Sequence, residues 1–196
     1  MQDLKDPTDP LSPLGRKLLK LDPHAYAQLV PEGDAGNATA RDLLQGVKSS
    51  DLITGTVARR DEADALLAGM WLYFDWLDES HRISQSIETP TGSFWHAIMH
   101  RREGDFSNSK YWYARCANHP VLPTLAAAAG QLVNSMPADK SLLRLIATGW
   151  NPNAFVDLVE QVHDNANDPR HALAVSLQRL EWQTLFNHGT RAASGA

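Results

Sequence analysis

Apolar residues recur every three or four positions along most of the chain, the spacing of helices that bury one face. The longest run begins near Arg59, and its apolar members are Ala63, Leu66, Leu67, Met70, Trp71, Phe74 and Leu77. This run predicts one helix from residue 59 to about residue 87, with Leu67, Met70, Trp71 and Phe74 facing the core. No segment shows the strict apolar–polar alternation of a half-buried strand.

Glycine, proline and small polar residues divide the pattern into further helices. The stretch "ETPTG" should end the first long helix, and Ser93 can cap the next, which runs to about Glu103. After "EGDFSN", Ser107 or Asn108 can cap a third helix over 109–117. The other helices are expected at 14–21, 25–30, 40–48 (capped by Thr39), 123–133, 140–148, 153–164 and 169–186.

These elements predict an all-α, single-domain helical bundle of about seven to nine helices. An extended N-terminal arm precedes it, since residues 1–13 hold three prolines and no periodic pattern. Within this one domain, we expect an arm with short helices over 1–58, a helical core over 59–189 and a frayed tail over 190–196.

Composition narrows the class of protein. The 196 residues are 43% hydrophobic, carry a net charge of −5 and include one cysteine. An acidic chain lacks the basic stripe that nucleic acid requires, and one cysteine excludes an intrachain disulfide. No apolar run approaches the ~20 residues of a membrane span. The polar start MQDLKDPTDP resembles no secretion signal, so we expect a cytoplasmic protein that binds neither nucleic acid nor membrane.

The polar end of the long predicted helix is the first feature that points to chemistry. On a helical wheel, the apolar stripe continues into Asp78, His81, Gln85 and Glu88. Burying such groups unpaired costs several kcal/mol each. They therefore bond to one another, bind an ion or face a wet cavity, unless the helix end has simply reached solvent.

The next predicted helix carries His96, Met99, His100 and Glu103 along one face. Histidines at positions i and i+4 lie one turn apart and can share a metal ion. The chain lacks His-Glu-x-x-His here, which excludes the metalloprotease motif. Two histidines on one face can also be no more than its solvated side.

Because the link "TPTG" is short, the two helices should pack as antiparallel neighbours. We therefore expect His81, His96 and His100 to converge as metal ligands, with Asp78 or Gln85 orienting an imidazole. Zinc, iron, manganese and copper all suit such a set. Glu88 or Glu103, whichever is not a ligand, would act as general base.

The third helix of this region adds groups that can hold a small molecule. Tyrosine hydroxyls and arginine forks orient polar or anionic ligands, and tryptophan stacks on rings. We expect Tyr113 to take part in catalysis, and the substrate-binding residues to be Gln85, Arg101, Lys110, Trp112 and Arg115. The competing interpretation is that Trp112 packs in the core and the cations lie in solvent.

The stretch "QSIETPTGSFWHAIMHRREGDFSNSKYWYARCANHPV" resembles a signature of a family of uncharacterised microbial proteins. The resemblance covers roughly residues 77–121. It implies no specific activity and assigns no catalytic residue.

The leading hypothesis is a metal-dependent enzyme of the hydrolase or lyase type, acting on a small-molecule substrate. One alternative is a metal-free pocket that binds a polar or anionic small ligand. Another is a helical interaction protein with a buried polar network, and a homo-oligomer is compatible with each.

Overall fold

The computed structural model describes residues 10–32, 36–116, 118–137 and 139–195. The described residues form ten α-helices, two short 3-10 helices and no strand, so the predicted all-α fold is confirmed. The elements are α1 (Pro13–Leu21), α2 (Ala38–Leu44), η1 (Ser49–Leu52), α3 (Arg60–Tyr73), α4 (Leu77–Ser84), α5 (Pro90–Arg102), α6 (Phe106–Tyr113), η2 (Ala114–Cys116), α7 (Leu122–Asn134), α8 (Lys140–Leu143), α9 (Pro152–Val162) and α10 (His171–Ser194).

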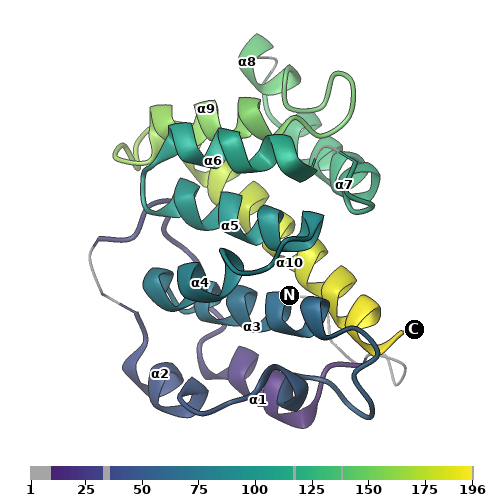
Figure 1. Cartoon of the computed structure of the whole chain (residues 1–196). Coiled ribbons are helices and arrows are strands. Elements are labelled where there is room, and N and C mark those ends of the chain that lie inside the picture. The colour runs from purple at the N-terminus through teal and green to yellow at the C-terminus, as the bar shows by residue number, and fades with distance from the viewer. Residues whose placement is uncertain (1–9, 33–35, 117, 138, 196) are drawn as a thin grey trace.

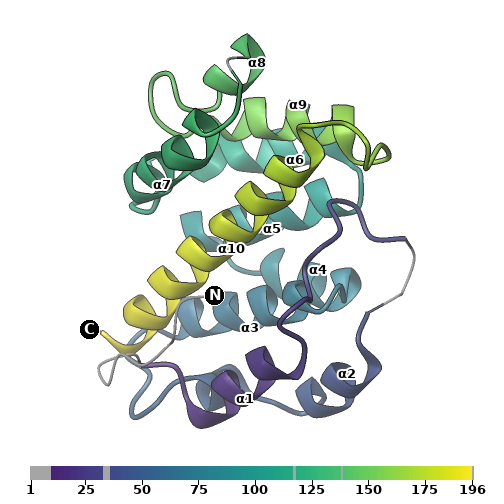
Figure 2. The ribbon, with the colours of Figure 1, turned by 180° about the vertical axis from the view of Figure 1, so that it is seen from behind.

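The helices are stacked from α1 and α2 at one end to α8 and α9 at the other (Figure 1). In the middle, α3, α4, α5 and α6 follow one another in alternating directions, and each packs against the next. The long helix α10 crosses behind this stack and contacts α3, α7 and α9 (Figure 2). Its central position joins the two ends of the molecule around one apolar core.

The prediction of a single helix over 59–87 was wrong, because the chain turns between α3 and α4. Asp75 has the left-handed φ of 64°. Its amide donates to the Leu72 carbonyl at 3.2 Å, and the amide of Trp76 donates to the Trp71 carbonyl at 3.1 Å. This pair of bonds is the Schellman arrangement that closes a helix C-terminus. The polar positions of α4 therefore do not continue the apolar stripe of α3.

Several other boundaries differ from those expected. Residues 25–30 form bends and irregular structure rather than a helix, and α8 covers only the beginning of the segment 140–148. The amides at three helix starts are capped by Asn37, Thr89 and Asp105. Each of these caps lies about one turn or less before the cap predicted from the sequence. The reason is that a side-chain oxygen earlier in the chain already accepts from a free amide of the first turn.

Both ends of the described chain pack on the bundle. Residues 1–9 of the expected arm lie outside the described residues. The amide of Ser12 donates to the Leu52 carbonyl at 2.8 Å, so the described end of the arm is held against η1. Residues 190–194, expected to fray, are the last turns of α10, and the amide of Ala58 donates to the Ala193 carbonyl at 2.8 Å. Among the described helices, none combines the length and apolar character that a bilayer span requires.

Candidate metal centre

Three histidines from two helices meet where α4 crosses α5. His96 and His100 lie one turn apart on α5, and His81 approaches them from α4. The ring centroid of His81 is 4.9 Å from that of His96 and 5.3 Å from that of His100. One ring nitrogen from each histidine lies within 4.8 Å of the other two. The structure therefore brings together three nitrogen atoms that could hold a metal ion.

The two histidines of α5 face each other directly. The Nε2 atoms of His96 and His100 are 2.9 Å apart, and their rings are nearly parallel, with an interplanar angle of 23°. Both side chains are buried, whereas His81 is half-buried. The three nitrogens thus lie at the edge of the core and not within it.

Helix α6 packs over His96 and His100. It presents Asn108 and Trp112 to them, which have the same i, i+4 spacing as the two histidines. Asp105 caps this helix by accepting from the Asn108 amide at 3.0 Å, which fixes its first turn. Trp112 then lies against His96, with ring centroids 4.1 Å apart, and the Asn108 Nδ2 atom is 3.1 Å from the His100 Nε2 atom. Because α5 and α6 are antiparallel, an i, i+4 pair on one helix meets an i, i+4 pair on the other.

Glu103 orients the imidazole of His100. Its Oε1 atom lies 2.6 Å from Nδ1 of His100. An ionised carboxylate only accepts hydrogen bonds, so Nδ1 donates the proton. The neutral ring then carries its lone pair on Nε2, the atom that faces His96. A carboxylate paired with a histidine in this way is the usual support of a metal-bound imidazole.

The neutral form of His96 is favoured by its surroundings. Burial lowers the pKa of His96 to about 4, and the neighbouring His100 and His81 act in the same direction. A neutral imidazole offers a lone pair, which is the form that binds metals. The Nδ1 atom of His96 is buried and has no hydrogen-bond partner among the described residues.

The two predicted acidic residues are placed differently. Glu88 is exposed in the link between α4 and α5 and belongs to neither group of potential ligands found among the described residues. Glu103 contacts His100 and, with Asp105, forms a second potential group around it. Asp78 and Gln85 are exposed. The structure therefore differs from the expectation that one of them lies beside an imidazole and orients it.

Tyr113 and Arg101 belong to a separate buried network with Glu181 of α10. Arg101 Nη1 donates to the Tyr113 hydroxyl at 2.6 Å, and that hydroxyl donates to Glu181 Oε1 at 2.9 Å. A second nitrogen of Arg101 lies 2.6 Å from Glu181 Oε2. All three side chains are buried, and burial raises the pKa of Tyr113. This network joins α5, α6 and α10 and presents no reactive group to solvent.

The other predicted binding residues lie around the surface of α6. Lys110 forms an ion pair with Asp157 of α9 at 2.5 Å. Arg115 donates to the exposed Tyr111 hydroxyl at 2.6 Å, and its guanidinium lies 5.0 Å from the Trp112 ring centroid. Trp112 is therefore next to His96 and Arg115 lies beside Trp112, whereas Lys110 is engaged with another helix.

Asn108 is the site residue that the sequence interpretation missed. It was expected only as an N-cap, but its amide lies beside His100. The signal was present in the i, i+4 spacing of Asn108 and Trp112, which matches the spacing of His96 and His100. Using that signal requires knowing that α6 packs antiparallel on α5.

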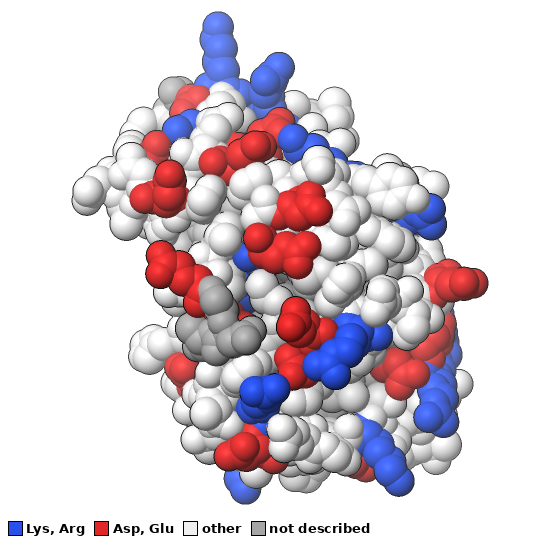
Figure 3. Space-filling model, turned by 60° about the vertical axis from the view of Figure 1, so that its left-hand side comes forward, with Lys and Arg blue, Asp and Glu red and all other residues white. Residues whose placement is uncertain are grey.

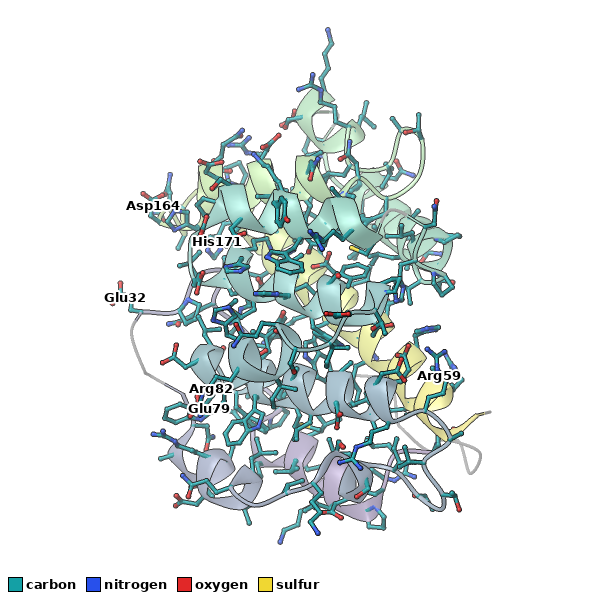
Figure 4. The ribbon with its side chains drawn as sticks, in the orientation of Figure 1. Glu32, Arg59, Glu79, Arg82, Asp164 and His171 are labelled. Atoms are coloured by element: carbon teal, nitrogen blue, oxygen red, sulfur yellow. The ribbon has the colours of Figure 1, made fainter. Side chains whose placement is uncertain are left out.

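Two acidic side chains lie beside one of the histidines, since Glu103 and Asp105 each place a carboxylate oxygen within 4.8 Å of a ring nitrogen of His100. Figure 3 brings forward the side of the molecule where α5 ends and α6 begins, and acidic residues predominate in the middle of that face. On α4, the Glu79 carboxylate forms ion pairs with Arg82 and Arg41, each with a nitrogen–oxygen distance of 3.2 Å. Glu79 and Arg82 lie side by side in Figure 4. A negative surface attracts cations toward the site.

Comparison with known proteins gives no identity. No family model, curated protein or solved structure matches the chain. The chemical assignment of the site therefore depends on its geometry.

Proposed function

We propose that the protein binds a divalent transition metal through His81, His96 and His100 and uses it in hydrolase- or lyase-type chemistry on a small molecule. The observation that supports this most is the convergence of three imidazole nitrogens within 4.8 Å, two of them on one rigid helix. Neutral nitrogen ligands suit zinc, copper and iron better than manganese, which prefers oxygen. Zinc is our first expectation.

The spacing of the nitrogens is close to what zinc needs. With zinc–nitrogen bonds of ~2.0–2.1 Å, two ligands of a tetrahedral site lie roughly 3.3 Å apart. The Nε2 atoms of His96 and His100 are 2.9 Å apart. A shift of a few tenths of an ångström, within the reach of small side-chain rotations, would admit the ion.

The fourth position would hold the reacting water. Zinc with three histidine ligands lowers the pKa of bound water to about 7, which supplies hydroxide at neutral pH. Asn108 would hydrogen-bond that water, a role supported by the distance of 3.1 Å between its Nδ2 atom and His100 Nε2. Glu103 is engaged by His100, so we assign it the orienting role and not that of general base.

Substrate would approach over α6. Trp112 is half-buried and offers a ring beside His96, and Arg115 holds a positive charge 5.0 Å from that ring. A planar or anionic small molecule fits this combination.

Metal content tests the proposal. Protein purified without a histidine tag is analysed by elemental analysis, then stripped with chelator and titrated with zinc. We expect one ion per chain in the parent and none in His96→Ala or His100→Ala, with helix content unchanged by circular dichroism. His171→Ala is the matched control, since His171 lies at the start of α10 and belongs to neither group of potential ligands among the described residues.

Two results would overturn the proposal. In one, the stripped parent binds zinc no more tightly than the His96→Ala variant. In the other, both α5 variants retain the ion. The Nε2 contact between His96 and His100 would then be an ordinary hydrogen bond in a buried polar network.

A further inference from the structure

A cavity of the described chain lies away from the histidines. It has a volume of about 550 Å³ and is lined by α10, α1, the segment 23–26, Tyr73 of α3 and Leu132 of α7. The helix α10 and the N-terminal segment lie together on the face shown in Figure 2, whereas α4 and α6 lie in front in Figure 1. None of the three clustered histidines lines it. Cavities of this volume are typical of small-molecule sites.

Aromatic rings form one side of this cavity. Trp182 and Phe186 are stacked, with centroids 4.5 Å apart and an interplanar angle of 15°, and Tyr73 lies 4.7 Å from Trp182. The polar atoms of these rings are already satisfied, because Trp182 donates to the Gly69 carbonyl and Tyr73 to the Asp22 carbonyl. The exposed part of each residue is small, 6% for Trp182, 2% for Phe186 and 7% for Tyr73. That part offers apolar contact to a ligand and requires no hydrogen bond from it.

The segment beside these rings is held in a strained conformation, with the Tyr26 ring 6.2 Å from that of Tyr73 and 6.1 Å from that of Trp182. Tyr26 has a φ of 63°, which is rare for a bulky residue. Arg179 fixes this segment by donating to the carbonyls of His24, Ala25 and Tyr26 at 3.1, 3.3 and 3.4 Å. Arg102 adds a contact 4.0 Å from the Tyr26 ring centroid. Strain that is held in place beside a cavity is a feature of binding sites, where it fixes the wall before the ligand arrives.

The charges around the cavity select an anion. Arg179 is the only arginine or lysine among the lining residues, and none of those residues carries a carboxylate. Arg179 uses Nε and Nη2 for the wall, and its Nη1 has no acceptor in the described part of the chain. Two further α10 residues, Gln183 and Asn187, line the cavity, and their side-chain amides have no hydrogen-bond partner among the described residues.

We infer that this cavity is a second ligand site, which binds a small aromatic carboxylate. The ring would lie against Trp182 and Phe186, and the carboxylate would accept hydrogen bonds from Arg179 and from the amide of Gln183 or Asn187. This site is separate from the histidine cluster, so it does not depend on the metal proposal.

Isothermal titration with three probes of one shape tests the inference. They are naphthoate, naphthylmethanol and naphthylmethylammonium, which share a ring system and differ in charge. We expect the parent to bind naphthoate at least ~10-fold more tightly than the alcohol and to bind the ammonium most weakly, since the charge-assisted bond to Arg179 is the discriminating contact. Equal affinity for all three, or preference for the ammonium, would overturn the inference.

Two variants locate the site. Ser176→Trp places a ring at the exposed rim of the cavity and should abolish binding of naphthoate and naphthylmethanol together. Arg179→Gln should abolish the preference for naphthoate over naphthylmethanol. Since it also removes the bonds that hold the segment 24–26, the ratio of the two affinities is the readout. Arg144→Gln, at an exposed arginine of the α8 region, is the matched control and should bind like the parent. Circular dichroism confirms that each variant is folded. Unchanged naphthoate binding in folded Ser176→Trp and Arg179→Gln would refute the site.

Discussion

Arg102 of α5 binds the carboxylate of Asp75, the left-handed residue at which α3 ends, with a nitrogen–oxygen distance of 2.6 Å. The same guanidinium donates to the carbonyl of Leu72 at 2.8 Å and to that of Gln28 at 3.0 Å. One buried side chain thereby fixes the turn from α3 into α4. Since that turn sets the direction of α4, it also places His81 over α5.

Arg102→Ala should lower the free energy of unfolding by about 3–5 kcal/mol, because it leaves an ionised partner and two carbonyls without their donor. Urea denaturation measures the loss. Asp75→Asn should cost less, since asparagine tolerates the left-handed conformation and still accepts a hydrogen bond. Arg82→Ala, at an exposed arginine of α4, is the control and should be nearly neutral. Equal stability of Arg102→Ala and Arg82→Ala would show that the turn forms without Arg102.

Two helical glycines give opposite expectations for the same substitution. A methyl group on Gly69 would lie 2.7 Å from the buried Trp95 ring, whereas one on Gly130 would meet only Ile146 at 3.8 Å. Gly69→Ala should therefore destabilise the protein by about 1–3 kcal/mol through overpacking. Gly130→Ala should stabilise it by about 0.5–1 kcal/mol, because alanine loses less backbone entropy in a helix. The melting temperatures of both variants, compared with that of the parent, test these expectations. A higher melting temperature for Gly69→Ala would contradict the packing of α3 on α5.

A buried hydrogen-bond chain predicts loss of stability in acid. Val121 donates its amide to His119 Nδ1 at 3.3 Å, so the proton lies on Nε2, which donates to the Thr91 hydroxyl at 3.1 Å. Thr91 in turn donates to Glu62 at 3.0 Å. Burial lowers the pKa of His119 to about 4, from 6.5 for an ordinary histidine, and His188 contributes to the shift.

Between pH 6.5 and 4, unfolded His119 is protonated while the folded residue stays neutral. The unfolded state then binds more protons, so the free energy of unfolding should fall as the pH falls through this range. Urea denaturation of metal-free protein at several pH values measures the slope. In His119→Gln the slope should be shallower, and an identical slope would assign the acid sensitivity to other groups.

The helical class and the histidine pair follow from local spacing, which explains why they could be predicted. A period of three to four residues identifies a helix, and His96 and His100 necessarily share a face of it. Predicting that His81 converges with them required only the observation that a short link joins two neighbouring helices. These inferences use information contained within a few turns of chain.

The errors depend on contacts between distant residues. Nothing local to Asp75 marks it as a helix end, because the guanidinium that stabilises the turn comes from Arg102, 27 residues later. The buried contacts of Tyr113 could not be predicted either, since its partner Glu181 lies 68 residues away. A side chain that looks available for chemistry in the sequence can be committed to a buried network.

The arrangement of Glu103 gives the sharpest test of how the metal would be held. If Glu103 acts only through His100 Nδ1, Glu103→Ala should weaken zinc binding by roughly 10–100-fold, the usual effect of removing such a support. Glu103→Gln should bind with intermediate affinity, because its amide carbonyl still accepts from Nδ1. Competition with a chromophoric chelator measures both affinities.

Asp105 separates this arrangement from direct ligation. It lies near His100 and Glu103 in the second potential ligand group, and it also caps α6. Asp105→Asn keeps the cap, since asparagine is as good an N-cap as aspartate, but removes the negative charge. With the ion on His81, His96 and His100, Asp105→Asn should bind zinc like the parent. If it weakens binding as much as Glu103→Ala does, while His81→Ala has no effect, the ion belongs to the carboxylates at the α5–α6 turn instead.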